Sequence, residues 1–295
     1  MIDARNLTKV YSRVPALDNV SFHIEEGLIV GVIGHNGAGK TTLLKILSGL
    51  ASPTSGQLSI NGIDVIRDPD GIKAGLGYLS EESRLYETMT VDDYLSFFGE
   101  IYGLDARTIA ERRDHLLKAL SLEPNGKKIG EFSKGMKRKA AIARSLIHDP
   151  AVLIYDEPTS GLDPMTSRYI AGFLRDLRDR KKTIVLSAHN LFQVESICDQ
   201  VMILRRGKMI AMGTMHELRE MFGSISYTIS FTIDNIAEIR GCKEYTYEGG
   251  VYKVPAESIE ELNRCTSIIS AHGGTVERIE SHYPSLEEML VKVGK

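Results

Sequence analysis

Three short runs of mostly apolar, β-branched residues occur along the chain, at residues 28–33, 151–155 and 183–186. Such runs are typical of strands in a parallel sheet, because both faces of these strands are covered. Residues 20–24 instead alternate between apolar and polar positions, as a half-buried strand does. Residues 2–33 therefore read as β-rich, and the pattern predicts an α/β protein.

Shorter elements surround these strands. Residues 57–65 are predicted to form a hairpin that turns at Asn61 and Gly62, and residues 201–211 to form another around Arg206 and Gly207. Residues 75–79 are a further strand, followed by the polar loop 80–84.

The periodicity becomes helical from about residue 85 to about residue 150. One apolar face recurs at helical spacing at Val91, Tyr94, Leu95, Phe98 and Tyr102. A second helix is expected over about 105–120, with inward positions Ile109, Leu116, Leu117 and Leu120, and a third is expected after Ser133. This block interrupts the α/β pattern, so we expect a helical subdomain inserted into a first domain of residues 1–222.

The composition changes after residue 222. Residues 225–233 alternate strictly between apolar and polar, which predicts a strand with one buried and one wet face. Strands near 243–247, 250–254 and 275–280, a helix over about 257–272 and a last helix from Ser285 would complete a small α+β domain of residues 223–295. This domain carries no catalytic motif, and its role as a dimerisation element, a ligand sensor or packing is open.

Composition narrows the class of protein. Of 295 residues, 42% are apolar and 25% charged, as in soluble globular proteins, and the net charge of −3 gives no basic field for nucleic acid. We expect no signal peptide and no membrane helix, since no apolar run approaches the roughly 18–20 residues required. Cys198, Cys242 and Cys265 have no metal-binding spacing and read as ordinary thiols in a reducing compartment.

Residues 34–42 carry the clearest chemistry. Gly34, Gly39, Lys40 and Thr41 fit G-x-x-x-x-G-K-[ST], between a predicted strand and a predicted helix. In such a loop, successive backbone N–H groups and the start of the helix hold a phosphate chain. Lys40 would neutralise the outer phosphates, and the Thr41 hydroxyl would bind Mg²⁺. The whole predicted ATP cradle comprises Gly34, Asn36, Gly37, Ala38, Gly39, Lys40, Thr41 and Thr42.

Two further positions concern the same nucleotide. The strand at 151–155 ends in Asp156 and Glu157, and an acid after such a strand is where P-loop proteins hold a second Mg²⁺ contact. Tyr11 is expected in a short loop after the first strand, where it either stacks on the base or simply packs.

The order of motifs over residues 2–222 resembles the ATP-binding subunit of an ABC transporter. The loop at 34–42 resembles Walker A, and residues 153–157 resemble Walker B with its catalytic glutamate. Residues 131–138 resemble the ABC signature, 160–163 the D-loop and 187–189 the H-loop. Residues 223–295 resemble the accessory C-terminal domain of exporter-type subunits that pair with separate ABC-2-type permeases.

The resemblance implies roles for several residues. Glu157 would act as the general base, and His189 would contact the γ-phosphate. Ser133 and Gly135 would act on the ATP held by a second subunit in a head-to-tail dimer, homomeric or heteromeric, with Asp163 at the same interface. The chain would be an ATPase on the cytoplasmic face of the membrane.

Two positions depart from the family pattern. Lys134 replaces the first signature glycine, and Glu81 stands where a glutamine is usual. Glu81 can still bind Mg²⁺ or orient water, although with an added negative charge. Leu85, Tyr86 and Met89 follow in the same loop, and they either form the permease contact or fold back onto the helical block.

Two other functions compete with this interpretation. A soluble ABC ATPase of DNA repair or translation would usually carry two ATPase units, a coiled coil or metal-binding cysteines, none of which is visible here. A non-hydrolysing ATP-binding regulator is the second alternative, and four residues argue against it, namely Lys40, Asp156, Glu157 and His189.

Overall fold

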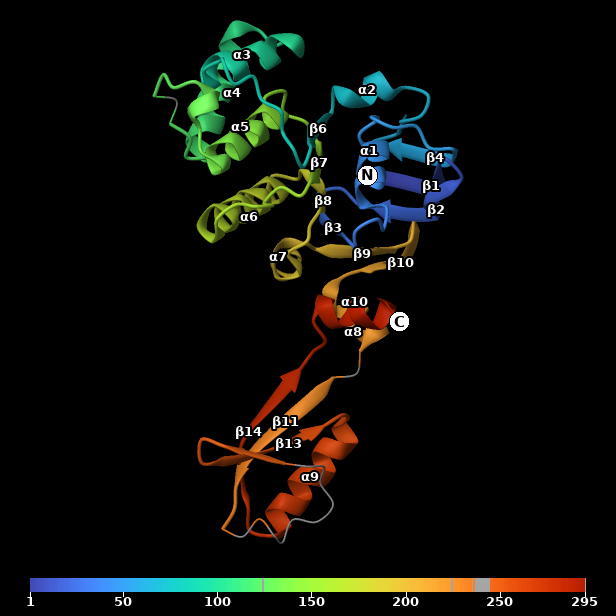
Figure 1. Ribbon diagram of the computed structural model, residues 1–295, viewed down its shortest axis with the longest axis vertical. Helices are drawn as coiled ribbons and strands as arrows, with labels where there is room; N and C mark the ends of the chain where they lie inside the picture. Colours follow the sequence, from blue (N-terminus) through green and yellow to red (C-terminus); the bar gives the residue numbers. More distant parts are fainter. Residues whose placement is uncertain (124, 224, 235, 237–244, 295) are drawn as a thin grey trace. The chain divides into compact units, whose positions relative to one another are not determined.

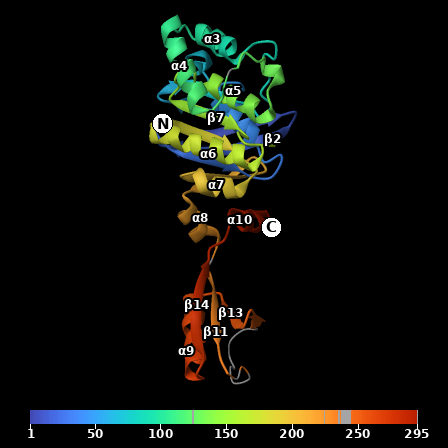
Figure 2. The same ribbon diagram turned by 90° about the vertical axis from the view of Figure 1, so that its left-hand side faces the viewer.

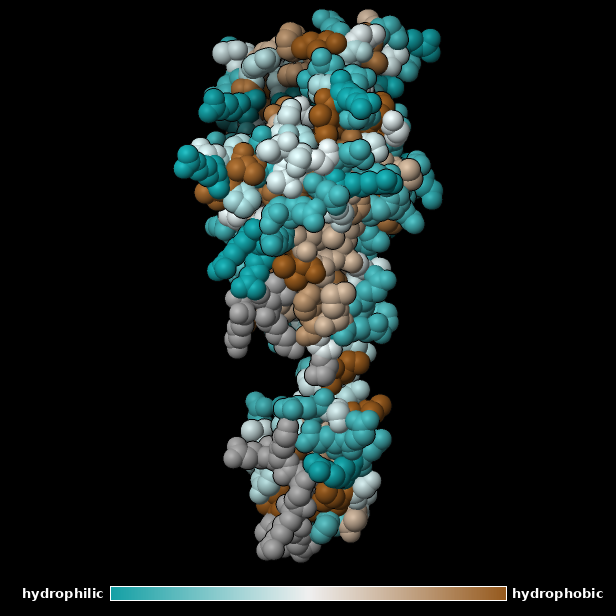
Figure 3. All heavy atoms as spheres, turned by 90° about the vertical axis from the view of Figure 1, so that its right-hand side faces the viewer, coloured by the Kyte–Doolittle hydropathy of each residue, from teal (hydrophilic) through white to brown (hydrophobic). Residues whose placement is uncertain are grey.

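The computed structural model of the chain describes residues 1–123, 125–223, 225–234, 236 and 245–294. The chain divides into two compact units, Met1–Met215 and His216–Lys295. This division falls at the start of helix α8 (Met215–Phe222), whereas the sequence places it after this helix. In the described part of the chain, no helix is both long enough and apolar enough to span a membrane. Buried residues are mainly apolar, and the surface in Figure 3 mixes polar with apolar side chains.

A six-stranded sheet with the order β10-β9-β3-β8-β7-β6 forms the centre of the first unit. Its strands are β3 (Ile29–Ile33), β6 (Leu76–Leu79), β7 (Val152–Asp156), β8 (Thr183–Ser187), β9 (Gln200–Arg205) and β10 (Lys208–Gly213). Five of them are parallel, and β10 pairs with β9 as an antiparallel edge. Every residue of β3, β7 and β8 is buried, which confirms the interpretation of the three apolar runs.

A second, antiparallel sheet has the order β2-β1-β4-β5. Its strands are β1 (Ile2–Tyr11), β2 (Val14–Ile24), β4 (Ser55–Ile60) and β5 (Ile63–Asp64). Helix α1 (Lys40–Leu47) lies between the two sheets (Figure 1), and its apolar side chains share one core with both of them. The start of α1, which carries Lys40, is therefore held by packing on two sides.

Helices α6 (Pro164–Asp179) and α7 (Leu191–Ile197) cover the other face of the six-stranded sheet (Figures 1 and 2). The sequence interpretation contains neither of them, nor α2 (Pro69–Lys73) or α8. The signal for α6 is nevertheless present. Asp163 caps its first turn, Pro164 follows, and Ile170, Phe173 and Leu174 are buried at helical spacing.

The expected helical block consists of α3 (Val91–Ile101), α4 (Ala106–Ala119) and α5 (Lys134–Leu146), with a 3-10 turn, η1 (Ile129–Glu131), before α5. These helices pack against one another, and α5 also contacts β6. The predicted inward residues of α3 and α4 are buried, except for two. Phe98 is half-buried, and Tyr102 lies just after the end of α3, is 37% exposed and stacks on His148 with ring centroids 3.7 Å apart.

The second unit contains a four-stranded antiparallel sheet with the order β12-β13-β11-β14. Its elements after α8 are β11 (Ser226–Thr232), β12 (Thr246–Glu248), β13 (Val251–Ala256), α9 (Ile259–Ala271), β14 (Thr275–His282) and α10 (Leu286–Gly294). Helix α9 covers one sheet face over a core that includes Ile229 and Phe231. Residues 243–244 of the predicted strand, and Cys242, lie outside the described residues.

One residue of the predicted wet face is an exception. Ser230 is only 7% exposed. Its cross-strand neighbours are Lys253 and Arg278, and long side chains of this kind can cover a small residue on the same face of a sheet.

Candidate functional site

The loop of residues 34–42 joins the end of β3 to the start of α1, as predicted. Gly39 has a φ of 108°, and a Cβ there would lie 2.4 Å from the carbonyl oxygen of Ala16. A Cβ at Gly34 would similarly meet the carbonyl oxygen of Leu204 at 2.2 Å. Glycine is therefore required at both positions because neighbouring backbone approaches the loop, in addition to the tight turn expected from the sequence.

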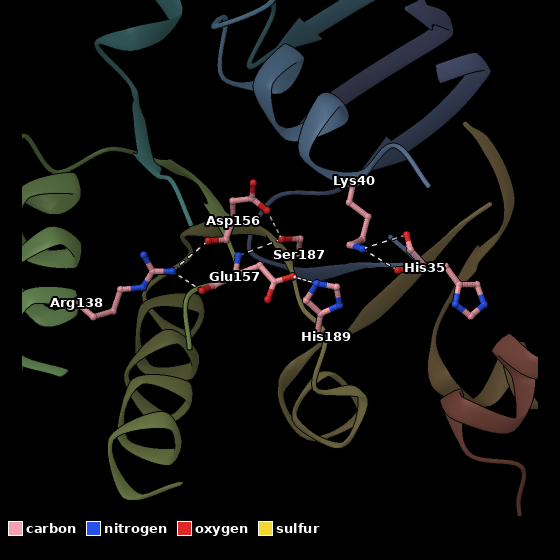
Figure 4. A network of polar contacts seen from close by, with 8 residues as sticks. His35, Lys40, Arg138, Asp156, Glu157, Ser187 and His189 are labelled. Carbon is pink, nitrogen blue, oxygen red and sulfur yellow. Dashed lines mark hydrogen bonds and ion pairs between the residues drawn. The ribbon is translucent and has the colours of Figure 1, made fainter. Parts of the chain in front are cut away.

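Lys40 is the first residue of α1, and its positively charged side chain is buried. Its side chain is 7% exposed, and its Nζ donates to the carbonyl oxygens of Gly34 at 2.7 Å and His35 at 3.4 Å (Figure 4). Burial lowers the pKa of Lys40, and the carboxylates of Glu157, Asp156 and Glu81 oppose this effect. The loop thus places a positive charge beside three acids.

Two of these acids stand at the end of strand β7, since Asp156 is its last residue and Glu157 follows it, and one hydroxyl on the neighbouring strand β8 bonds to both residues. Ser187 is paired with Asp156 in the parallel register of β7 and β8. Its Oγ donates to Asp156 Oδ1 at 2.5 Å and accepts the backbone N–H of Glu157 at 3.0 Å (Figure 4). Asp156 is 3% exposed and Glu157 5% exposed.

The Glu157 side chain points to His189, which follows β8. His189 Nε2 lies 2.9 Å from Glu157 Oε1 (Figure 4). Burial raises the pKa of Glu157, and His189 acts in the opposite direction. Glu157 also has a φ of 52°, a backbone conformation that non-glycine residues rarely adopt.

These groups surround a hollow of about 310 Å³. It is lined by Ala16, Asn36, Gly37, Ala38, Gly39, Lys40, Thr41, Thr42, Glu81, Glu157 and His189. The structure therefore brings most of the predicted ATP cradle together with Glu81, Glu157 and His189. Asp156 is buried beside the hollow rather than lining it.

Tyr11 differs from the sequence expectation. It is the last residue of β1, not a loop residue, because β1 continues to its pairing with Val14 of β2. Its ring is 47% exposed, lies 4.9 Å from Lys9 Nζ and is not among the described residues that line the hollow. Its contact with a base stays a prediction.

Ser133, Gly135 and Asp163 form a separate cluster. Ser133 caps α5 by accepting the N–H of Met136, and Asp163 caps α6 by accepting the N–H of Thr166. The hydrogen bonds from Thr166 lower the pKa of Asp163. A Cβ at Gly135 would lie 3.2 Å from Thr166 Cγ2, so the first turns of α5 and α6 meet.

This cluster does not line the hollow at Lys40. A larger hollow of about 700 Å³ begins at Glu157 and His189 and continues between α6 and α7, past Ser160 and Gly161.

Sequence reasoning missed three contributors. Ala16 lines the hollow through the close approach of β2 to the loop, and no motif marks it. Ser187 was named only as part of a motif, since its two hydrogen bonds depend on the register of β7 and β8. Arg138 is 7% exposed, and its helical spacing from Ala141 and Ile142, both fully buried, was a signal for its burial.

The oxygen donors present fit Mg²⁺. The described residues contain no cluster of three or more His, Cys, Asp or Glu side chains that could hold a metal ion. Mg²⁺, however, is usually bound through one or two carboxylates together with substrate phosphates. Asp156, Glu81 and the hydroxyl of Thr41 would supply this kind of partial ligand set.

The fold and this site define a P-loop nucleotide-binding protein. Comparison with known proteins narrows the class. Residues 17–160 match the family model "ABC transporter", and residues 213–293 match "ATP-binding protein DrrA1-3-like, C-terminal domain".

Curated relatives agree with the match to the ABC transporter family. The ABC transporter ATP-binding protein NatA of Bacillus subtilis is 39% identical over 209 residues, which is 70% of this chain and 85% of that protein. The uncharacterized ABC transporter ATP-binding protein YxlF of Bacillus subtilis is 35% identical over 302 residues, covering 99% of each chain.

Solved structures show the same fold. An ATP-binding subunit of an ABC transporter has a TM-score of 0.70 at 33% identity, covering 75% of this chain and 93% of that one. The dimeric post-hydrolysis state of the ATP-binding cassette MJ0796, bound to ADP and Pi, has a TM-score of 0.67 at 26% identity, covering 72% and 98%.

The chain belongs to the family of ABC transporter ATP-binding proteins. It is accordingly an ATP-binding protein and an ATPase whose hydrolysis of ATP is coupled to transmembrane transport. Subunits of this family dimerise and work with membrane permeases.

Proposed function

We propose that the hollow at Lys40 binds the phosphates of ATP and that Glu157 is the general base for hydrolysis. The observation that carries this proposal is the convergence of Lys40, Glu157 and His189 on one hollow at the start of α1. Backbone N–H groups of the loop and the first turn of α1 would hold the phosphates, with Lys40 neutralising their charge. Glu157 would take a proton from the attacking water, and His189 would contact the γ-phosphate.

Mg²⁺ would be held by Thr41 and Asp156, with Glu81 as a further contact. When bound, the ion neutralises charge on the β- and γ-phosphates. The hydrogen bond from Ser187 keeps Asp156 Oδ1 oriented and leaves the other carboxylate oxygen available for the ion.

The pocket would be completed by a second subunit. Ser133, Gly135 and Asp163 lie at two helix N-termini that do not line the hollow of their own chain. Helix N-termini favour anions. In a head-to-tail dimer of two copies, or of this chain with a different subunit, Ser133 and Gly135 would contact the ATP held by the partner.

The permease would contact the loop around Tyr86. Tyr86 is 50% exposed and lies at the edge of an aromatic cluster with Tyr94, Phe97 and Phe98 of α3. Phe97 is 38% exposed and Ile101 60% exposed on the same helix. An exposed apolar surface on the helical block supports a partner contact, even though Tyr86 itself packs back onto α3.

Export through a separate ABC-2-type permease is the direction that we propose. The match of residues 213–293 to the DrrA1-3-like C-terminal domain supports it. Similar proteins include the Nod factor export ATP-binding protein I of Ralstonia nicotianae, 36% identical over 219 residues. The chain would then lie on the cytoplasmic face of the membrane, and the second unit would support the dimer.

Replacing Glu157 by Gln tests the assignment of the base. Loss of a general base should slow turnover by on the order of 10²–10⁴, while ATP binding is kept and ATP-bound dimers accumulate. ATP turnover and size-exclusion chromatography with ATP provide the measurements. Glu82→Gln, on the exposed neighbouring loop, is the matched control. Turnover of Glu157→Gln equal to that of the control would remove Glu157 from this role.

A further inference from the structure

A buried arginine connects the signature helix α5 to both acidic segments of the site. Arg138 is only 7% exposed, and it has no carboxylate partner among its hydrogen bonds. Its guanidinium donates to acceptors on two segments. On the loop after β6, the acceptors are the carbonyl oxygens of Ser80 and Glu81 and the Oγ of Ser83. At the end of β7, they are the carbonyl oxygens of Asp156, Glu157 and Pro158. One planar group therefore joins the loop after β6 to the end of β7.

A buried charge satisfied only by neutral acceptors is costly, since carbonyl oxygens replace water but supply no counter-charge. Burial accordingly lowers the pKa of Arg138 to about 10, with nearby Asp156 and Glu81 acting in the opposite direction. The side chain remains charged at neutral pH, and its planar fork spreads five donors in a fixed geometry over both segments, whereas a lysine carries its three donors on a single nitrogen.

Arg138 donates a hydrogen bond to the backbone of Glu157, and this backbone sets the direction of the proposed base. Glu157 has its unusual φ of 52°, and both of its backbone polar atoms are held. Ser187 Oγ accepts its N–H, and Arg138 Nη2 donates to its carbonyl oxygen (Figure 4). Such a conformation persists only where the surroundings hold it.

The same guanidinium fixes the loop that carries Glu81. Nη1 donates to the carbonyl oxygens of Ser80 at 2.8 Å and Glu81 at 3.1 Å. Glu81 lines the hollow, so both Glu81 and Glu157 are tied to one residue of α5. Arg138 lies five residues after Ser133, about 7.5 Å along the helix at 1.5 Å per residue.

We propose that Arg138 is a positioning residue: it holds the Glu157 peptide and the Glu81 loop in fixed register with α5, and thereby aims the general base. The proposal rests on the proposed function, because it acts through Glu157. Through Arg138, a movement at the N-terminus of α5 would also change the position of the base.

A double-mutant cycle between Arg138 and Glu157 tests the proposal with the purified full chain. Arg138→Gln should leave ATP binding unchanged and lower kcat by up to about 100-fold, the order expected when a catalytic group is misplaced by about 1 Å. In the Glu157→Gln background the same change should lower kcat much less, because the base that it positions is already absent and only the Glu81 loop is still displaced.

Arg144→Gln is the matched control. Arg144 lies on the same helix and donates to the Tyr94 hydroxyl and to the Tyr78 carbonyl oxygen, away from the Glu157 peptide. Its effect on kcat should be small and equal in both backgrounds. If Arg138→Gln fails to fold, as judged by thermal unfolding, Arg138→Lys enters the same cycle and should give an intermediate kcat.

The outcomes separate the two proposals. An equal loss of kcat from Arg138→Gln in both backgrounds overturns the positioning role and leaves the proposed function standing. A Glu157→Gln variant with unchanged turnover overturns the proposed base and the positioning role together.

Discussion

Ser187 shows how one small side chain can organise two acids. Its hydroxyl accepts the N–H of Glu157 and donates to Asp156, so it uses both of its hydrogen-bonding functions in a fully buried position. The parallel pairing of β7 and β8 places it there. The orientations of the Asp156 carboxylate and of the Glu157 backbone therefore depend on a strand that carries neither residue.

Ser187→Ala should lower ATP turnover by more than its loss of folding stability alone would explain. The change leaves the buried N–H of Glu157 without its partner, at a cost of about 1–3 kcal/mol in the free energy of unfolding. Turnover should fall while ATP binding is largely kept, as measured by steady-state kinetics and by binding of ATP. Ser145→Ala removes a buried hydroxyl bonded to Tyr155, and because neither residue lines the hollow, this variant is the control.

Ser145→Ala should lower stability to a similar extent and leave turnover per folded molecule unchanged. Equal turnover of the two variants would contradict the orienting role of Ser187.

At the scale of single residues, the sequence was sufficient to predict a site residue where a motif fixes its position in the chain. Lys40 was predicted from the spacing of its loop motif, Glu157 and His189 were assigned through the family resemblance, and the structure brings all three to one hollow. Ser187 and Arg138 were not assigned their contacts, because these depend on strand register and on the approach of α5 to two loops. Tyr11 was misplaced because nothing in the local pattern shows that β1 extends to its hairpin partner.

Among the elements, the ends of α3 and α5 are joined by a stacked pair. Tyr102, just after α3, stacks on His148, just after α5, and His148 Nε2 contacts the carbonyl oxygen of Leu76 at 3.2 Å. Burial lowers the pKa of His148 from 6.5 to about 4, and the positive charges of Arg112 and Lys182 act in the same direction. The helical block is thus fastened by a histidine that is neutral in the folded protein.

This pair predicts an acid sensitivity of the fold. Because the pKa of His148 is lower in the folded than in the unfolded chain, the unfolded chain binds the proton more tightly. The free energy of unfolding should therefore decrease as the pH falls from about 6.5 towards about 4. His148→Phe keeps the stacked ring but cannot titrate, so this part of the decrease should disappear.

Urea unfolding at about pH 7 and about pH 5 measures the effect. The same change at His115, an exposed histidine of α4, controls for the introduced phenylalanine. An identical pH dependence in His148→Phe and the unchanged protein would contradict the prediction.

Element prediction succeeded where burial is uniform along a segment. Strands β3, β7 and β8 are continuous apolar runs, and both of their faces are covered. Helix α6 was missed because its buried positions are separated by charged residues on the exposed face, although Asp163 and Pro164 mark its start. Ser230 was expected to be exposed but is buried, and its pairing with Lys253 and Arg278 is a cross-strand feature that the strand's own sequence does not show.

In the first unit as a whole, two groups of predicted site residues stay apart. Lys40, Glu157 and His189 face one hollow, whereas Ser133 and Asp163 cap the helices α5 and α6 outside it. A chain with this arrangement has a phosphate cradle with a base, and separately a pair of helix N-termini suited to an anion. The split pocket that we propose follows from this separation.

The dependence of ATP turnover on protein concentration tests this split pocket most directly. We predict that turnover per chain, at saturating ATP, falls steadily as the purified protein is diluted, because the monomer lacks the groups that a second subunit supplies. Turnover per chain that stays constant at every dilution, with the protein shown to be monomeric, would contradict the account.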